Sequence, residues 1–499
     1  MAAPVTNVAS NFLTILIPFI TAFVIAMLLV PLARRLAHRT RIVAHPRNDR
    51  WHRGTVPLLG GVAMAGAMLI GALILGVAPL ILVPLSAAMA MFVLGLVDDA
   101  LALKPATKLI AQIAMAATVL YFGYRLNWLD SRLLDSVLTM VWIVGLTNAF
   151  NLLDNMDGLC GGIAFVVAVM VLAGLVGGAA PERAGPEVTF LSLLAGSIAG
   201  FLVFNFPPAS IFMGDSGALF LGFSLATLTL GHEGVRGSRS DVVSVIAGPL
   251  FVLLIPIFDT TLVTVLRLLS GRSPAMGGRD HSSHRLVAIG LSERSAVLVL
   301  WSLAAIGGAI GVAMRSVAEG EGMPLVAGGF FLLLMCGLAV YLSRVHVYED
   351  LPANARVTPL WGEFMYKQRV AEVLIDAVLT GLAYYAVNKW FFDPEAYLRN
   401  AENFYRALPL IVAGQLVAFF VIGLYRNNWQ YESPKDALRI ATGVLAGTVG
   451  AQIALIVVYQ FWDHSLIVFA LYAAVLVVIV TLSRVFERGL VRYFAGLAR

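Results

Sequence analysis

The chain has 499 residues, of which 60% are hydrophobic and 13% are charged, and its mean hydropathy is +0.87. Because a soluble protein carries about a quarter of its residues as charged side chains, this composition excludes a soluble globular protein and indicates a surface that mostly faces lipid. The formal net charge of +5 is confined to particular loops, which fits membrane orientation better than nucleic-acid binding. Cys160 and Cys336 lie far apart in apolar stretches and imply neither a disulfide framework nor a zinc site.

The apolar segments predict an all-α polytopic membrane protein, because each spanning helix needs about 20 mostly apolar residues. We expect fifteen spans, at residues 11–33, 57–76, 78–97, 109–124, 134–150, 159–178, 188–204, 217–231, 241–266, 296–314, 323–343, 373–390, 407–425, 438–460 and 465–483. No Lys or Arg precedes Arg34, so the first span should be uncleaved with its N-terminus outside. The C-terminus is then cytoplasmic, and 25 of the 34 Lys and Arg residues fall in cytoplasmic segments, as the positive-inside rule predicts.

The first predicted cytoplasmic loop holds a basic run between His45 and Arg53. Arg50 and His52 in this run are candidates for binding a phosphate group. The alternative is a basic flank that only orients the first span.

An acid pair, Asp98-Asp99, ends the third predicted span, and Lys104 and Lys108 follow it. Carboxylates at a membrane edge suit Mg²⁺, which commonly combines one or two of them with phosphate oxygens. The alternative is a pair of acids that only marks the end of a helix at the interface.

Polar residues also gather at the end of the fifth predicted span, where Asn148, Asn151, Asp154 and Asp157 precede Gly158. If this segment is helical, Asp154 and Asp157 share a face. Asn and Asp side chains can hold a base or a ribose through paired donors and acceptors. A capped turn is the alternative, since turns are also rich in these residues.

A third polar segment runs from Asn205 to Gly217 and contains Pro207-Pro208, which ends a helix. Asp215 is a candidate metal ligand and Phe212 is a candidate for stacking on a base. A re-entrant turn with Asp215 capping the next helix is the alternative.

The fourth segment contains His281, His284 and Arg285, which can bind a diphosphate. A zinc site is disfavoured, because the two histidines are three residues apart and no third ligand follows. Asp259 lies inside an apolar span, so it is a candidate functional residue or the partner of a neighbouring helix.

Taken together and in this order, these segments resemble the polyprenyl-phosphate N-acetylhexosamine-1-phosphate transferases of the WecA/MraY superfamily. The resemblance covers residues 10–345. It implies that Asp98, Asp99 and Asp215 gather around Mg²⁺, with Mn²⁺ as an alternative, and that one of the acid pair acts as a base. It also implies that Lys108 holds the lipid phosphate, that Asn148, Asn151, Asp154, Asp157 and Phe212 bind the nucleotide, and that His281, His284 and Arg285 lie near the diphosphate.

The resemblance implies transfer of an N-acetylhexosamine 1-phosphate from a UDP-sugar to polyprenyl phosphate, at the cytoplasmic face of a bacterial inner membrane. The motif His281-Ser-Ser-His284 lacks the three consecutive histidines of the MurNAc-pentapeptide branch, which favours the N-acetylhexosamine branch. One-step transfer and a covalent aspartyl intermediate are both compatible with the sequence. A transporter of lipid-linked sugars and an inactive scaffold are the alternative functions.

The sequence predicts three parts: a transferase domain at 1–345, a cytoplasmic connector at 346–365 and a four-helix membrane module at 366–499. The last part resembles the membrane region of polysaccharide-biosynthesis epimerases and dehydratases, on residues that include Asp376 and Tyr425. It has no Gly-rich dinucleotide fingerprint. We expect it to dock sugar-modifying enzymes or to support a homodimer.

Overall fold

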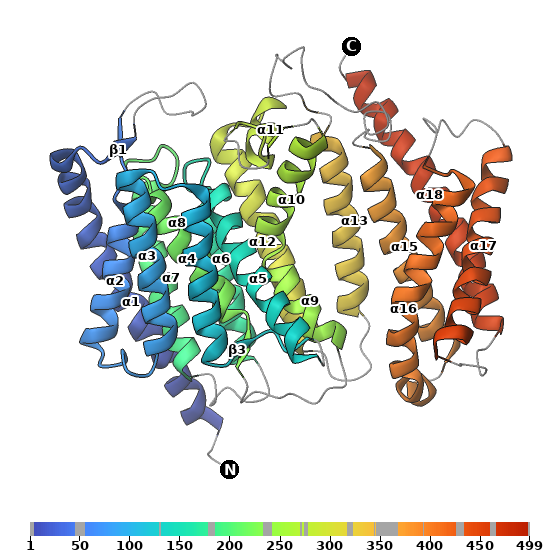
Figure 1. Ribbon diagram of the computed structural model, residues 1–499, viewed down its shortest axis with the longest axis horizontal. Coiled ribbons are helices and arrows are strands. Elements are labelled where there is room, and N and C mark those ends of the chain that lie inside the picture. Colours follow the sequence, from blue (N-terminus) through green and yellow to red (C-terminus); the bar gives the residue numbers. More distant parts are fainter. Residues whose placement is uncertain are drawn as a thin grey trace. The chain divides into compact units, whose positions relative to one another are not determined.

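The computed structural model describes residues 4–44, 55–128, 131–177, 185–232, 242–269, 272–273, 278–316, 323–343, 345, 368–392, 394–425, 434–459 and 466–497. These residues are almost entirely helical (Figure 1). Among them, nine helices are long and apolar enough to cross a membrane. The chain is therefore an all-α polytopic membrane protein, while the total of fifteen spans and their orientation stay predictions. The chain forms two compact units.

Unit 1 contains twelve helices within residues 4–316 of the described chain: α1 (Pro4–Thr40), α2 (Gly60–Ile74), α3 (Leu82–Leu101), α4 (Pro105–Tyr121), α5 (Arg132–Leu153), α6 (Leu159–Val176), α7 (Gly185–Asn205), α8 (Gly214–Leu228), α9 (Val242–Val252), α10 (Leu254–Leu269), α11 (Ser282–Ala288) and α12 (Glu293–Ser316). At the centre, α8 packs against α2, α3 and α5, and α7 packs against α1, α2 and α6. Every residue of α8 from Ser216 to Leu228 is buried. A helix that is apolar on all sides belongs in such a central position.

The outer helices of unit 1 present apolar side chains outward. On α1, a stripe of Leu and Ile residues that includes Leu28 and Leu32 is about half exposed. In a membrane protein such a face contacts lipid rather than water.

One predicted span, 241–266, is two helices in the structure. α9 ends at Val252 and α10 begins at Leu254. Pro256 lies in the first turn of α10 and has no N–H to donate to the carbonyl of Val252, so one hydrogen bond of a continuous helix is missing at this point. The break places Asp259 near the start of α10.

Two short pairs of strands lie at opposite ends of the unit 1 helices. β1 (Val43–Ala44) pairs with β2 (Val56–Pro57), and β3 (Tyr124–Arg125) pairs with β4 (Gly231–His232), both antiparallel. Figure 1 shows β1 and α11 at one end of the unit and β3 at the other.

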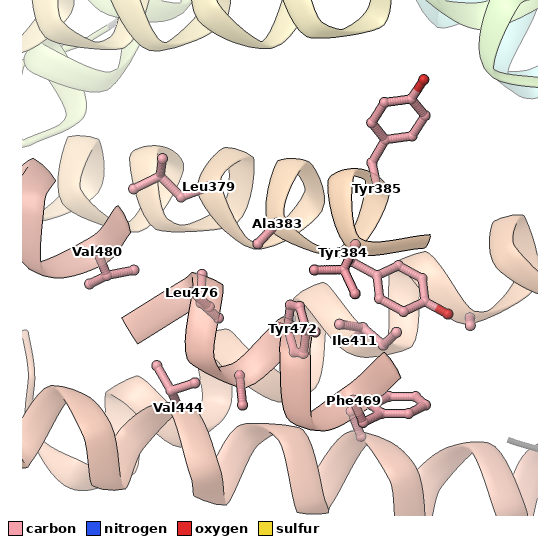
Figure 2. Packing of buried hydrophobic residues seen from close by; sticks show 14 of the residues in the cluster. Leu379, Ala383, Tyr384, Tyr385, Ile411, Val444, Phe469, Tyr472, Leu476 and Val480 are labelled. Atoms are coloured by element: carbon pink, nitrogen blue, oxygen red, sulfur yellow. The ribbon is translucent and has the colours of Figure 1, made fainter. Parts of the chain in front are cut away.

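Unit 2 contains α13 (Met323–Ser343), α15 (Gln368–Phe391), α16 (Pro394–Ile422), α17 (Pro434–Tyr459) and α18 (Leu466–Leu497). Its core is a cluster of aromatic and aliphatic side chains from α15, α16, α17 and α18 (Figure 2). The ring of Tyr384 stacks on Phe404 with centroids 5.1 Å apart and meets Tyr472 edge-on at 5.8 Å. Unit 2 therefore has a hydrophobic core of its own.

A buried ion pair crosses the core of unit 2. Asp376 on α15 is fully buried and accepts a 2.6 Å hydrogen bond from Nη2 of Arg484 on α18 and a 2.9 Å bond from the Tyr425 hydroxyl. Polar contacts of this kind between helices fix their register in a membrane, where water cannot replace them.

The two units divide at a different place from the predicted domain boundary at 345. α13 groups with the C-terminal helices because it packs directly on α15. A Cβ atom added to Gly329 would lie 2.4 Å from Leu382 Cδ2, so the two helices approach closely at this glycine. The functions assigned to the parts stay predictions.

Candidate active site

Three helix ends of unit 1 bring two carboxylates and one ammonium together. Asp98 lies in the last turn of α3, Lys108 in the first turns of α4, and Asp215 in the first turn of α8. Lys108 Nζ donates to Asp98 Oδ2 at 2.6 Å and to Asp215 Oδ2 at 3.2 Å. The exposed fractions of these side chains are 6% for Asp98, 24% for Lys108 and 36% for Asp215. This carboxylate–lysine cluster is thus half-enclosed and open to a ligand on one side.

Asp99 has a different environment from its neighbour. Its two carboxylate oxygens accept the backbone N–H groups of Asp215, at 2.8 Å, and of Ser216, at 3.0 Å. These N–H groups belong to the first turn of α8 and have no partner within the helix, so a carboxylate from α3 satisfies them and complements the helix dipole. These contacts hold the start of the helix that carries Asp215, and the role of Asp99 as a metal ligand stays a prediction.

Gly95 explains how α3 and α8 come close enough for this contact. A Cβ atom at Gly95 would lie 2.4 Å from the backbone oxygen of Asp215. Gly214 itself has a φ of +69°, a conformation that favours glycine. Both glycines are therefore required for the approach of Asp99 to the start of α8.

The two predicted asparagines of α5 are both engaged in the site. Asn151 Nδ2 donates to Asp215 Oδ1 at 3.0 Å. Asn148 exchanges two hydrogen bonds with Gln112 of α4, at 2.7 and 3.3 Å. Because Gln112 lies one turn after Lys108, this amide pair fixes the helix that carries the lysine against the helix that carries Asn151.

Gln112 is the contributor that sequence reasoning missed. It is only 1% exposed. The sequence feature that could have identified Gln112 is a carboxamide inside an apolar span, four residues after Lys108. A buried amide of this kind needs a hydrogen-bond partner.

The turn after α5 differs from the helical arrangement considered for its acids. α5 ends at Leu153, and Asp154 is its C-terminal cap residue with φ −77° and ψ 54°. Asp154 and Asp157 therefore do not share a helical face. Asp157 Oδ2 accepts the Ala209 N–H at 2.8 Å, and Gly158 N donates to Asn205 Oδ1 at 3.1 Å. The turn is thus bound to the Pro-Pro segment that leads into α8.

The segment that contains Phe212 is bound through its backbone to β2 and to the start of α2. Phe212 N donates to Pro57 O at 2.8 Å, and Gly60 N donates to Phe212 O at 2.9 Å. The Phe212 side chain is half-buried, and its stacking on a base stays a prediction. Arg50 and His52 lie outside the described residues.

The histidine segment forms a second, buried polar cluster. His281 Nδ1 lies 2.7 Å from Asp259 Oδ2, and Arg267 makes a two-point contact with Asp280 at 3.0 and 2.6 Å. Arg285 donates to the backbone oxygens of Asp280 and Val345, both at 2.7 Å. Arg285 is 5% exposed, so its guanidinium organises this segment as well as being a candidate for phosphate binding.

His284 is neutral at physiological pH in this environment. Burial, together with the neighbouring His281, lowers the pKa of His284 to about 4. A histidine whose pKa is depressed by desolvation is uncharged at pH 7 and offers one donor and one acceptor.

A short stretch of chain connects the two clusters. Asn151 contacts Asp215, and four residues later Asn155 Oδ1 accepts a 2.7 Å hydrogen bond from the Ser283 hydroxyl. Arg294 Nε also donates to Pro207 O at 2.9 Å. The end of α5 and the turn after it therefore contact both the carboxylate–lysine cluster and the histidine segment.

A divalent cation fits the carboxylate–lysine cluster. The described residues contain no group of three or more His, Cys, Asp or Glu side chains set to hold a metal ion. However, Asp98 and Asp215 both approach the same cation, the Lys108 ammonium. Two carboxylates that face one small volume are the oxygen ligands that Mg²⁺ uses together with substrate phosphates.

The fold and the site together define a polytopic membrane protein with a carboxylate–lysine centre at the ends of its helices. Residues 81–232 match the model of glycosyl transferase family 4. The chain is 32% identical over 312 residues to a probable undecaprenyl-phosphate N-acetylglucosaminyl 1-phosphate transferase of Bacillus subtilis, with 58% of this chain and 82% of the relative covered. The chain therefore belongs to glycosyl transferase family 4.

Two further relatives support this membership. A decaprenyl-phosphate N-acetylglucosaminephosphotransferase of Mycolicibacterium smegmatis is 33% identical, with 56% of this chain and 77% of the relative covered. A phospho-N-acetylmuramoyl-pentapeptide-transferase of Lactobacillus johnsonii is 30% identical, with 43% and 75% covered. The matched family range contains Asp98, Asp99, Lys108 and Asp215 but ends before the histidine segment.

Proposed function

We propose that the protein transfers N-acetylhexosamine 1-phosphate from a UDP-sugar to polyprenyl phosphate, releasing UMP, as the initiating step of a cell-surface glycan. The observation that carries the proposal is the convergence of Asp98, Lys108 and Asp215 at one end of unit 1. Phosphoryl transfer between two anions depends mainly on charge neutralisation and in-line positioning. A centre of alternating charges provides both.

The reaction exchanges one phosphoanhydride for another. An oxygen of the lipid phosphate forms a bond to the sugar-linked phosphorus, and the bond from that phosphorus to the bridging oxygen breaks, so UMP leaves with the electron pair. Because the lipid phosphate is already an anion at neutral pH, the step needs little help from a base. Because little base catalysis is needed, direct attack by the lipid phosphate is favoured over a covalent aspartyl intermediate.

We assign each residue of the site a role in the transfer reaction. Lys108 neutralises phosphate charge at the lipid side, and Asn148 and Asn151 fix the position of this lysine and of Asp215. Asp154, Asp157 and Phe212 lie in the segments that face the nucleotide, and His281, His284 and Arg285 lie toward the diphosphate. Asp99 keeps the start of α8 in place.

Asp98 and Asp215 would hold a divalent cation, Mg²⁺ or Mn²⁺. When bound, this ion neutralises phosphate charge and stabilises the leaving group. The acids of the chain provide the oxygen ligands, and Lys108 supplies a second positive charge beside them.

The proposal is tested by incubating the purified protein with undecaprenyl phosphate, Mg²⁺ and a panel of UDP-sugars while UMP is measured. We expect UMP release with a UDP-N-acetylhexosamine, loss of release on addition of EDTA, and recovery with excess Mg²⁺. Folded protein that releases no UMP with any donor would contradict the proposal. In vesicles, movement of a lipid-linked sugar without a new covalent product would favour a transporter instead.

We further propose that the site faces the cytoplasm of a bacterial inner membrane. The distribution of Lys and Arg along the sequence supports this orientation. UDP-sugars are made in the cytoplasm, so a donor site on this face needs no transporter for its substrate.

For unit 2 we propose docking of a sugar-modifying enzyme, supported by its separate core and its resemblance to the anchors of epimerases and dehydratases. Because α13 packs with these helices, the truncation that tests the idea should begin after Ser316 rather than at residue 366. We expect the truncated protein to lose a co-purifying sugar-modifying enzyme. Unchanged complex formation and glycan output after this truncation would overturn the proposal.

A further inference from the structure

A buried acid on α10 makes all its described contacts with the start of the histidine segment. Asp259 is 1% exposed, and His281 and Ser282 are 3% and 0% exposed. Asp259 Oδ2 lies 2.7 Å from His281 Nδ1, and Asp259 Oδ1 accepts from both the backbone N–H and the hydroxyl of Ser282, at 2.7 and 2.6 Å. The two carboxylate oxygens of Asp259 thus contact two adjacent residues, His281 and Ser282.

This contact determines which ring nitrogen of His281 carries a proton. An ionised carboxylate can only accept hydrogen bonds, so Nδ1 of His281 must be the donor. The other ring nitrogen, Nε2, is left for a ligand. An imidazolium placed between Asp259 and a bound phosphate would donate from both nitrogens, one to each anion.

The location of the pair connects it with the carboxylate–lysine cluster. Ser283, next in the chain, donates to Asn155, which lies four residues after the Asp215 partner Asn151. The neighbouring His284 is neutral, because burial lowers its pKa to about 4. His281 lies beside the site with Asp259 as its carboxylate partner.

We propose that Asp259 is a positioning residue for the transfer reaction: it keeps the proton on Nδ1 and fixes the orientation of His281 so that Nε2 meets the diphosphate of the nucleotide sugar. The proposal rests on the proposed function. A carboxylate that orients a histidine in this way acts through the histidine and does not contact the substrate.

Asp259 lies close to the break between α9 and α10. Pro256 starts α10 anew after Leu253, and Asp259 follows one turn later. Asp259 therefore lies near the start of α10, where it contacts the start of the histidine segment.

The test compares Asp259→Asn, His281→Gln and the double variant in the full-length protein, by steady-state kinetics and by UMP binding in calorimetry. We expect Asp259→Asn to lower kcat/KM for the UDP-sugar at least about tenfold. This is the usual effect of replacing a residue that orients a functional histidine. The UMP affinity should fall with it, while KM for polyprenyl phosphate should not change. The double variant should be no worse than His281→Gln alone, because the two residues act as a unit.

Ser282→Ala is the matched control. It removes one hydrogen bond to Asp259 Oδ1 but leaves the backbone N–H bond and His281 in place, so its kinetics should stay within about twofold of wild type. If Asp259→Asn lowers only the amount of active protein and leaves the nucleotide KM unchanged, Asp259 is merely structural and the proposal fails. Multiplicative losses in the double variant would overturn it as well.

A measurement on the wild-type protein covers the case in which Asp259→Asn does not fold. Nitrogen-15 NMR of histidine-labelled protein should contain a protonated Nδ1 signal that His281→Gln removes; an unprotonated Nδ1 at His281 would refute the proposal. The proposed function fails separately, if the wild-type protein releases no UMP. Wild-type UMP release together with unaltered nucleotide kinetics in Asp259→Asn contradicts only the positioning role.

Discussion

Replacement of Asp215 by Asn should abolish turnover while leaving the protein folded. The carboxamide has nearly the same shape and keeps one oxygen, which can accept from either Asn151 or Lys108, so the packing of α8 against α3 and α5 is preserved. The negative charge, however, is lost. We expect kcat to fall on the order of 10³-fold, the scale for removing one preorganised group that stabilises charge during the reaction.

The measurement is UMP release at saturating substrates, with thermal unfolding as the check on folding. Glu187→Gln is the control, because Glu187 lies in the first turn of α7, about 27 Å along that helix from its other end beside the site. This variant should retain wild-type activity. A rate for Asp215→Asn close to that of Glu187→Gln would show that Asp215 has no part in the chemistry and would remove the metal assignment.

Replacement of Lys108 by Gln should have the second-largest effect. It removes the cation that lies between Asp98 and Asp215 and leaves two carboxylates facing the same small volume. Like charges at such a distance repel each other. We expect kcat to fall about 10²-fold and KM for polyprenyl phosphate to rise, because one preorganised positive charge is lost from the lipid side.

Lys104→Gln is a matched control for this variant. Lys104 is exposed and lies directly before α4, so the same change of residue type should alter kcat by less than about twofold, as surface substitutions usually do. Equal effects in the two lysine variants would mean that general positive charge at this face, rather than the contact with Asp98 and Asp215, supports activity. Unchanged KM for polyprenyl phosphate in Lys108→Gln would contradict the role at the lipid side.

The positions of the helices could be predicted because hydrophobicity is a local property. Each predicted apolar run corresponds to a helix in the structure, with ends that differ by a few residues in most cases. The exception is 241–266, where a proline in an otherwise apolar run interrupts the helix. Hydrophobicity averaged over a window does not register the missing N–H of Pro256.

The membership of α13 could not be predicted, because an apolar helix can pack equally well on several neighbours. Sequence analysis placed it in the predicted transferase domain at 1–345. The close approach to α15 at Gly329 decides its place in unit 2. Such a contact depends on the shape of both helix surfaces.

The residue types of the site were evident in the sequence, but the contacts that each residue makes were not. Asp98 and Asp99 are adjacent, and nothing in the sequence distinguishes them. Their side chains leave α3 in different directions, so Asp98 meets Lys108 and Asp99 meets the start of α8. Likewise, Asp259 was a candidate without a partner until the fold placed His281 beside it.

The sequence by itself determined that the chain is a polytopic helical membrane protein, and which polar residues end its spans on one side. Both conclusions follow from the cost of placing charges and unpaired polar groups in lipid, which acts on every segment separately. Only the tertiary structure decided which of these residues meet, since Asp98 and Asp215 are joined through Lys108 across more than a hundred positions of chain. Such contacts depend on how the helices pack, and glycines such as Gly95 set that packing.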